Sequence, residues 1–395
     1  MQASLSTTPA ILSLPVEVGS YIWEVIQSKE ALRALSITCK VFRHLSQCFI
    51  FRKFVLSFPF PGADDTESRL PHICERLGGL SMNKRLLSYI REMEIGSHSD
   101  SAWYMTLSPF PVSARPALAE CIEGMTSLKS FYLRQTVISS VLAQAILQAS
   151  ARQVIDLRLD RCSFSTLTEA SAAGRLRISN LEICIWNTLG GPSGSGPQNT
   201  PGPFLEKFVR AARLDVKSLN LNNNDFSNLN TFLDVHFPSL QSFILQTLSL
   251  PGVHNPSLCL AIHTFLHKHH SITRLKLLGS PRGCGVFQPF HPTSLPHLQE
   301  LECSAATVQQ LVPGRPVEII TVYIDDPSPS LPALSVLAKS TGMVKELYIF
   351  VGKCGATWTE LIELLETSAP KLQVLDVIHQ GLQGRTQVSY CVSEG

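Results

Sequence analysis

Charged residues, close cysteine pairs and long apolar runs are all scarce in this chain of 395 residues. Asp, Glu, Lys and Arg make up 16% of the sequence, below the roughly 25% of an average soluble domain. Apolar residues make up 44%, so the chain can bury a large core and is not disordered throughout. The length suggests two or three domains, or one elongated repeat array.

The charges nearly cancel, because 33 Lys and Arg face 31 Asp and Glu and leave a net charge of +2. A protein held mainly by phosphate contacts would carry a basic excess, so we expect no nucleic-acid partner. Residues 1–58 hold six basic and three acidic side chains. This local excess favours a protein partner for the first segment.

The 11 cysteines are odd in number and scattered, and no CxxC pair occurs. Secreted disulfide scaffolds have dense, even cysteines and zinc modules have close pairs, so we expect lone thiols in a reducing compartment. The first 18 residues lack the basic start of a signal peptide, and serines and glutamines interrupt the longest apolar helical window, residues 137–151. We therefore expect a cytoplasmic or nuclear protein with no membrane partner.

One short pattern recurs eleven times: an aliphatic residue, two variable residues, an apolar residue, one variable residue and another apolar residue. The copies begin at Ile90, Leu128, Val154, Ile178, Val216, Leu240, Ile272, Leu298, Val317, Val344 and Leu372. The last apolar pair of each copy predicts a short strand, and the segments between copies have helical apolar spacing. No single strand–helix pair can bury its own apolar face, so neighbours must stack into a parallel solenoid.

This pattern resembles the leucine-rich repeat family, whose fuller signature adds an Asn or Cys three residues after the L-x-L pair. In that family the added side chain satisfies backbone groups in the turn. Only Cys162 and Asn224 match here. The resemblance implies an irregular solenoid over residues 86–380, and the alternative is an unrelated α/β domain whose parallel strands give a similar pattern.

Residues 11–54 carry the most specific pattern in the chain. Leu14 and Pro15 open it with Glu17, and Pro15 suits the first turn of a helix. A second part reads LSITCKVFR over residues 35–43. The spacing of apolar residues predicts three short helices, which form a bundle with little core of its own and are stabilised by a partner.

This segment resembles an F-box, which opens with Leu-Pro-x-Glu and continues with L-x-x-L-S-x-x-C-K-x-F/W-R. It departs from that pattern at Gly19 and Ser20, which replace leucines, and in lacking an Asp-Pro turn. The resemblance implies that the segment binds the Skp adaptor, and through it the cullin of a ubiquitin ligase, while the repeat domain binds a substrate protein. The residues that we expect to contact the adaptor, at helical spacing along one face, are Leu14, Pro15, Ile22, Ile26, Leu35 and Phe42.

The expected fold class is α/β, with a small N-terminal three-helix F-box followed by an irregular leucine-rich-repeat solenoid with parallel strands. The expected parts are a disordered N-terminus at 1–10, the F-box at 11–57, a helical linker at 58–85, the solenoid at 86–380 and a tail at 381–395.

Side chains alternate along a strand, so the residues between and beside each L-x-L pair face away from the core. Charged residues dominate these positions in the early and middle copies. The last copies instead offer an aromatic and apolar group, with Glu346 and Asp376 at its rim, that has the composition of a binding site. The residues predicted to bind the substrate are Tyr323, Tyr348, Phe350 and Ile378. The alternative is that the tail folds over this face as a cap.

No catalytic or metal-binding constellation is recognisable. His263, His267 and His270 have a spacing that could supply metal ligands, but Thr264 stands where an HExxH motif needs glutamate, so we interpret them as solvated surface. No nucleophile, base and acid stand in a known pattern, and no cofactor loop occurs. We expect no enzymatic activity, no metal and no cofactor. The alternatives are a repeat scaffold without ligase association and an enzyme with an unrecognised site.

Overall fold

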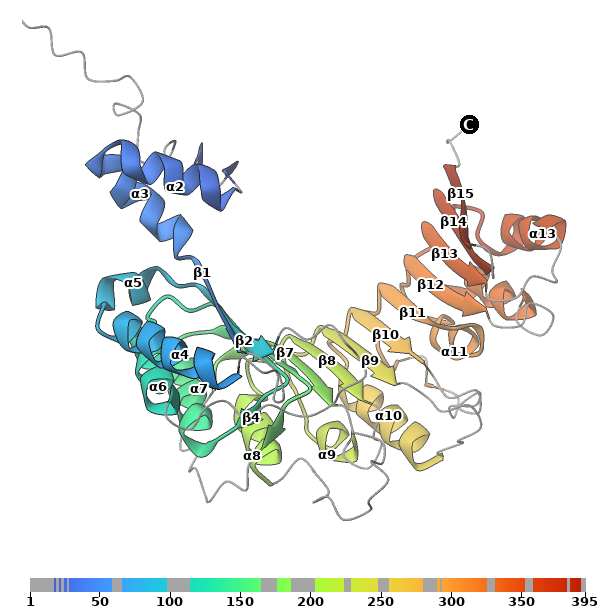
Figure 1. Ribbon diagram of the computed structural model, residues 1–395. Helices are drawn as coiled ribbons and strands as arrows, with labels where there is room; N and C mark the ends of the chain where they lie inside the picture. The colour runs from blue at the N-terminus through green and yellow to red at the C-terminus, as the bar shows by residue number, and fades with distance from the viewer. Residues whose placement is uncertain are drawn as a thin grey trace, which may run out of the picture. The chain divides into compact units, whose positions relative to one another are not determined.

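The computed structural model of the chain places the apolar repeat in strands that pair in parallel (Figure 1). Two compact units divide the chain, Met1–Ile155 and Asp156–Gly395. The residues that the structure describes are 18, 21–22, 25–26, 28–58, 66–97, 114–164, 176–185, 203–223, 229–247, 256–279, 290–291, 293–324, 331–351, 358–381 and 384–391.

The first unit combines helices with the first strands of the repeat. Its elements are α2 (Lys29–Thr38), α3 (Lys40–Ile50), β1 (Lys53–Phe58), α4 (Thr66–Ser81), α5 (Lys84–Tyr89), β2 (Glu92–Ser97), α6 (Arg115–Gly124), β3 (Ser130–Arg134), β4 (Val137–Ile138) and α7 (Ser140–Arg152). Strand β2 pairs in parallel with both β1 and β3. Among the residues described before α2, the backbone is helical at Val18, Tyr21, Ile22 and Val25.

Local capping explains why α2 and α3 are two helices rather than one. The Ser28 side chain accepts a hydrogen bond from the Ala31 amide at 3.2 Å and so begins α2. Cys39 has an extended backbone, which ends α2, and its sulfur accepts from the Phe42 amide at 3.4 Å at the start of α3. Leu32 is the only buried residue of α2, and Ser46 is the only one of α3.

The second unit is a run of strands in chain order, with helices between them. The elements are β5 (Ile155–Asp160), β6 (Ser163–Phe164), β7 (Ile178–Ile185), α8 (Pro203–Ala212), β8 (Ser218–Asn223), α9 (Leu229–Leu233), β9 (Ser242–Thr247), α10 (Pro256–Lys268), β10 (Arg274–Leu278), β11 (Glu300–Ser304), α11 (Ala305–Leu311), β12 (Ile319–Ile324), the 3-10 helix η3 (Leu331–Lys339), β13 (Glu346–Val351), α13 (Trp358–Ser368), β14 (Val374–Gly381) and β15 (Gly384–Cys391). Strands β7 to β14 pair in parallel, each with the next strand of that sheet. Figure 1 shows α8, α9, α10, α11 and α13 on one side of this sheet.

Equivalent positions of the repeat pair with one another from strand to strand. The central apolar residues are aligned in the order Leu181, Leu219, Phe243, Leu275, Leu301, Ile320, Leu347 and Leu375. All of them are buried. Because a shift of one residue would turn this whole set toward solvent, their burial fixes the register. The predicted α/β arrangement with parallel strands is confirmed.

The repeat pattern is wrong at one position. Val154, the expected first residue of the third copy, is 43% exposed, and its neighbour Ile155 is buried in its place. Ile155 is buried because it alternates with Leu157 and Leu159 along β5, although it stands one residue too late to fit the repeat pattern. Leu372 in the last copy is only partly buried.

The structure adds strands at both ends of the predicted solenoid. Strand β1 begins within residues 11–57, where only helices were expected, and its Leu56 is fully buried. At the other end, β15 pairs antiparallel with β14. For residues 384–391 the alternative of a cap over the face of the sheet is wrong, because this segment extends the sheet by hydrogen bonding to its edge.

Residues 1–10, together with Leu14 and Pro15, lie outside the described residues.

The buried side chain of Arg315 forms hydrogen bonds with backbone carbonyls before and after α11 and at its end. The Arg315 side chain donates to the backbone carbonyls of Ser294 at 2.7 Å, Leu311 at 3.1 Å and His291 at 2.9 Å. It also donates to the carbonyls of Gln310 and Pro313. The guanidinium thus satisfies carbonyl groups at the end of α11 that the helix itself leaves without a partner. Burial lowers the pKa of Arg315 to about 10, which leaves it protonated at neutral pH.

His269 is a second buried polar side chain, with 1% of its surface exposed. Its Nε2 accepts a hydrogen bond from the Phe237 amide at 2.9 Å, and its Nδ1 donates to the Phe265 carbonyl at 2.6 Å. These contacts require the neutral ring with its proton on Nδ1. Burial lowers the pKa of His269 to about 4.

The stability of the second unit should therefore depend on His269 between pH 6.5 and 4. The unfolded chain binds a proton near pH 6.5 and the folded chain does so only near pH 4, so the free energy of unfolding falls as the pH drops through this window. The contribution is about 3 kcal/mol when fully lost. Urea unfolding at several pH values should show this slope for wild type and a shallower one for His269→Gln.

The exposed neighbour His270 provides the matched control, because His270→Gln removes one histidine without touching the buried contacts. This variant should keep the wild-type slope. Equal slopes for wild type and His269→Gln would contradict the assignment.

Candidate protein-binding surfaces

The strands of the second unit have one buried face and one face that solvent reaches. In β12, Ile320, Val322 and Ile324 are buried, whereas Ile319 and Tyr323 are partly exposed. The same alternation holds in β13 and in the described side chains of β14. We call the partly exposed side of this sheet the open face.

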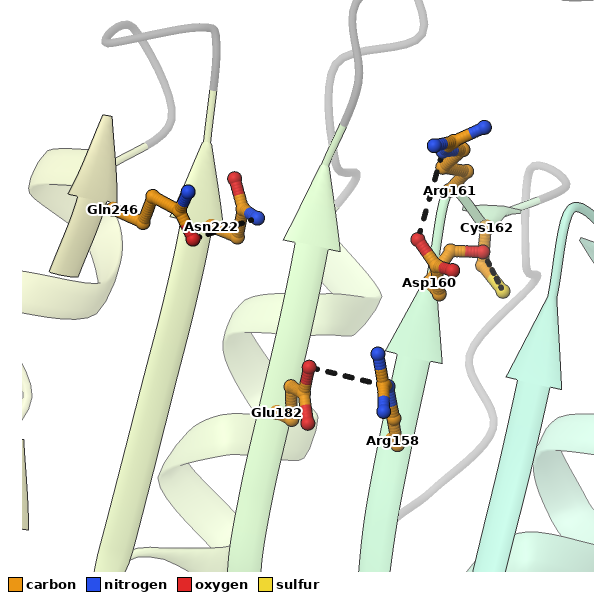
Figure 2. A network of polar contacts seen from close by, with 7 residues as sticks. All are labelled: Arg158, Asp160, Arg161, Cys162, Glu182, Asn222 and Gln246. Atoms are coloured by element: carbon orange, nitrogen blue, oxygen red, sulfur yellow. Dashed lines mark hydrogen bonds and ion pairs between the residues drawn. The ribbon is translucent and has the colours of Figure 1, made fainter. Parts of the chain in front are cut away.

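In the middle of the sheet, acidic and basic side chains on the open face pair across neighbouring strands. Arg158 lies 3.1 Å from Glu182, as Figure 2 shows, and Arg274 lies 2.9 Å from Glu300. Lys276 pairs with Glu302. These pairs neutralise one another, so this part of the open face presents little net charge.

Figure 2 also shows polar contacts near the ends of three strands. Asp160 and Arg161 form an ion pair at 3.7 Å, and the Cys162 thiol donates to the Asp160 carbonyl at 3.6 Å. The Asn222 amide donates to Gln246 at 3.3 Å on the next strand. The Cys162 contact satisfies a backbone group of the turn, as the leucine-rich-repeat resemblance implies for this position. Asn224, the other matching residue, lies outside the described residues.

Two of the aromatic residues predicted to bind the substrate stack on neighbouring strands. Tyr323 and Phe350 are register partners, with ring centroids 4.9 Å apart and planes 19° apart. The Tyr323 hydroxyl donates to Glu302 at 2.8 Å. Burial raises the pKa of Tyr323, and its bond to Glu302 raises that pKa further. The repeat pattern does not connect Glu302 with Tyr323, because only the register of β11 and β12 brings the two residues together.

Tyr348 and Ile378 are the other two residues predicted to bind the substrate. The Tyr348 hydroxyl donates to Glu346 at 2.9 Å, and this bond raises the pKa of Tyr348. Tyr348 is the register partner of Asp376, and Phe350 is that of Ile378. The structure therefore brings the four predicted residues onto adjacent strands of the open face. Their role in binding stays a prediction.

The N-terminal helices expose apolar side chains that differ from those predicted to contact the adaptor. Of the predicted set, Ile22, Ile26, Leu35 and Phe42 are partly buried. The most exposed are instead Tyr21 at 69% and Ile37 at 77%, and the other exposed apolar residues of this segment are Val18, Val25 and Val41. The intervals of three and four residues between Val18, Tyr21 and Val25 place them on one face of a helix. The apolar spacing found this segment but did not separate its inner from its outer face.

The three histidines of α10 and the turn after it do not converge. The His263 ring stacks on Phe290 with centroids 4.4 Å apart, and burial lowers its pKa. His267 shares a hydrogen bond with the Ser294 hydroxyl at 2.9 Å, and His270 lies edge-on to the His267 ring. Within the described ranges, no three His, Cys, Asp or Glu side chains gather as a metal site would require.

The cysteines differ from the expectation of lone thiols at one position, because Cys259 is disulfide-bonded. The described free cysteines are Cys39, Cys48, Cys74, Cys121, Cys162, Cys184 and Cys303.

In the part of the chain that the structure describes, no helix has both the length and the hydropathy needed to cross a bilayer.

Comparisons with known proteins leave the family open. No protein-family model matches the sequence, and no curated protein matches it. Among solved structures, the chain is similar to the leucine-rich repeat-containing protein LegL7 from Legionella pneumophila, with 14% identity and a TM-score of 0.43 over 83% of this chain and 91% of that one. The strand order and register define the fold.

The hydrogen bond between Tyr323 and Glu302 should contribute to stability. Tyr323→Phe keeps the stacked ring and removes only the hydroxyl, so the free energy of unfolding should fall by about 1 kcal/mol. Tyr348→Phe is the matched variant and should cost less, because burial is the leading cause of the pKa shift at Tyr323 but not at Tyr348. Urea unfolding of both variants checks this, and an equal or larger loss at Tyr348 would contradict it.

Proposed function

We propose that this chain is a substrate-recognition subunit of a cullin–RING ubiquitin ligase. Its N-terminal helices bind the Skp adaptor, and the open face of its second unit binds the substrate protein. The chain itself has no catalytic role in this proposal, and ubiquitin transfer is left to other subunits of the ligase. The observation that carries the proposal is the concentration of exposed apolar side chains at the segment that resembles an F-box.

Exposed large apolar side chains are concentrated in the N-terminal helices. Five of the twelve large apolar side chains that are exposed among the described residues lie between Val18 and Val41. Apolar residues scattered singly over a surface need no explanation, but a group of them marks a contact with another molecule. The adaptor would remove these side chains from water.

The weak core of the N-terminal helices supports the same proposal. Each of α2 and α3 buries a single residue, Leu32 and Ser46 respectively, and Ser46 is not apolar. Helices with so little buried apolar surface gain their stability from tertiary contacts with neighbours or with a partner. Binding of the adaptor would supply that missing contact area.

The experiment is co-purification of the full-length chain with the Skp adaptor. Ile37→Glu combined with Val41→Glu places charges on the exposed apolar surface and should weaken adaptor binding by about tenfold or more. Met82→Glu is the matched control, since Met82 is 87% exposed and lies outside these helices. It should bind as wild type does.

Adaptor binding that survives the double substitution would refute the proposed surface. A wild-type chain that fails to bind the adaptor, yet still retains other proteins through the open face, would instead support a repeat scaffold without ligase association.

A further inference from the structure

The open face of β12, β13 and β14 combines aromatic rings with acidic charge. Tyr323, Tyr348 and Phe350 supply the rings, and Glu346 and Asp376 supply the carboxylates. None of the open-face residues of these three strands between positions 319 and 378 is basic. A partly exposed surface of this composition favours a partner of the opposite charge.

Charge pairing distinguishes these strands from the rest of the open face. Glu182, Glu300 and Glu302 each lie against a basic side chain of a neighbouring strand. Glu346 instead accepts a hydrogen bond from the Tyr348 hydroxyl, and within the described ranges it forms no ion pair. Its negative charge is therefore left for a partner to neutralise.

Two carboxylates interact with Tyr348. Glu346 precedes it by two positions on β13, and Asp376 is its register partner on β14. Both carboxylates contribute to raising the pKa of the Tyr348 hydroxyl, after the hydrogen bond to Glu346 as the largest cause. Glu346, which forms no ion pair among the described residues, therefore places a negative charge beside this ring, and such a charge attracts cations.

We propose that the open face of β12 to β14 binds a basic segment of the substrate protein, with an Arg or Lys side chain against Tyr348 and Glu346. An apolar residue beside that cation would lie against Phe350 and Ile378. This inference rests on the proposed function, because it assigns the chemistry of the substrate to the substrate-binding face.

Two interactions would hold the cation. A guanidinium or ammonium group over the face of a tyrosine ring is attracted by the ring's negative face. The same group can donate to the Glu346 carboxylate, and such charge-assisted hydrogen bonds are stronger than neutral ones. Because the Tyr348 hydroxyl already holds Glu346 in place, little side-chain freedom would be lost when the partner binds.

A selection from random peptides tests the inference without knowledge of the substrate. Phage-displayed random dodecapeptides would be panned on the purified full-length chain, and the residue frequencies of retained peptides compared with those of the starting library. Retained peptides should be enriched in Arg and Lys, and their affinity should fall by about tenfold or more for Glu346→Lys.

Glu366→Lys is the matched control, because Glu366 is an exposed glutamate of α13 and its substitution changes the net charge equally. This variant should bind the selected peptides as wild type does. If Glu346→Lys lowers the melting temperature, Glu346→Gln replaces it, since glutamine removes the charge and keeps an acceptor for the Tyr348 hydroxyl. It should show a loss of the same sign.

Retained peptides without a basic excess would overturn the inference, as would basic peptides that bind Glu346→Lys as tightly as wild type. Adaptor co-purification does not depend on this face. Adaptor binding without basic selection therefore refutes only the inference, and basic selection without adaptor binding refutes only the proposed ligase role.

Discussion

The buried apolar pair of each repeat is the constraint on which the other features depend. A strand of five or six residues with two or three buried side chains is not stable alone, but it can align those side chains with the equivalent ones of the next strand. Burying a Leu or Ile side chain contributes about 1.5–3 kcal/mol, so each added strand favours one register over its alternatives. Once that register is set, the intervening residues face solvent. Function can then vary on one side of the sheet without cost to the core.

The repeated apolar positions could be predicted because burial requires the same residue types in every copy. The strand order followed from them, since each copy must stack on its neighbours. The end strands could not be predicted in the same way. Strand β1 carries the apolar pair Phe54 and Leu56 in register with the first copy, but Phe51 stands where the pattern requires an aliphatic residue. Strand β15 pairs antiparallel and does not follow the parallel repeat. Burial of Val154 was predicted wrongly, because the strand starts at Ile155 and its alternation turns Ile155 rather than Val154 toward the core.

The candidate binding surfaces could also be predicted only in part from the sequence. Alternation along a strand placed Tyr323, Tyr348 and Phe350 on the open face, because strand geometry leaves only two directions for a side chain. Their hydrogen bonds to Glu302 and Glu346 depend on rotamers and register, which no local pattern specifies. In the N-terminal helices, apolar spacing identified the segment. Which apolar residues pack inward and which stay exposed depends on how the helices contact one another, and residue spacing does not determine that.

The central claim is that one chain holds two different proteins through two separate surfaces, one in each unit. The most direct measurement immobilises the Skp adaptor, captures the chain on it and titrates a selected basic peptide onto the complex. The account predicts that the captured chain binds the peptide with the same affinity as the free chain. Failure of the adaptor to capture the chain, or release of the chain as peptide is added, would contradict it.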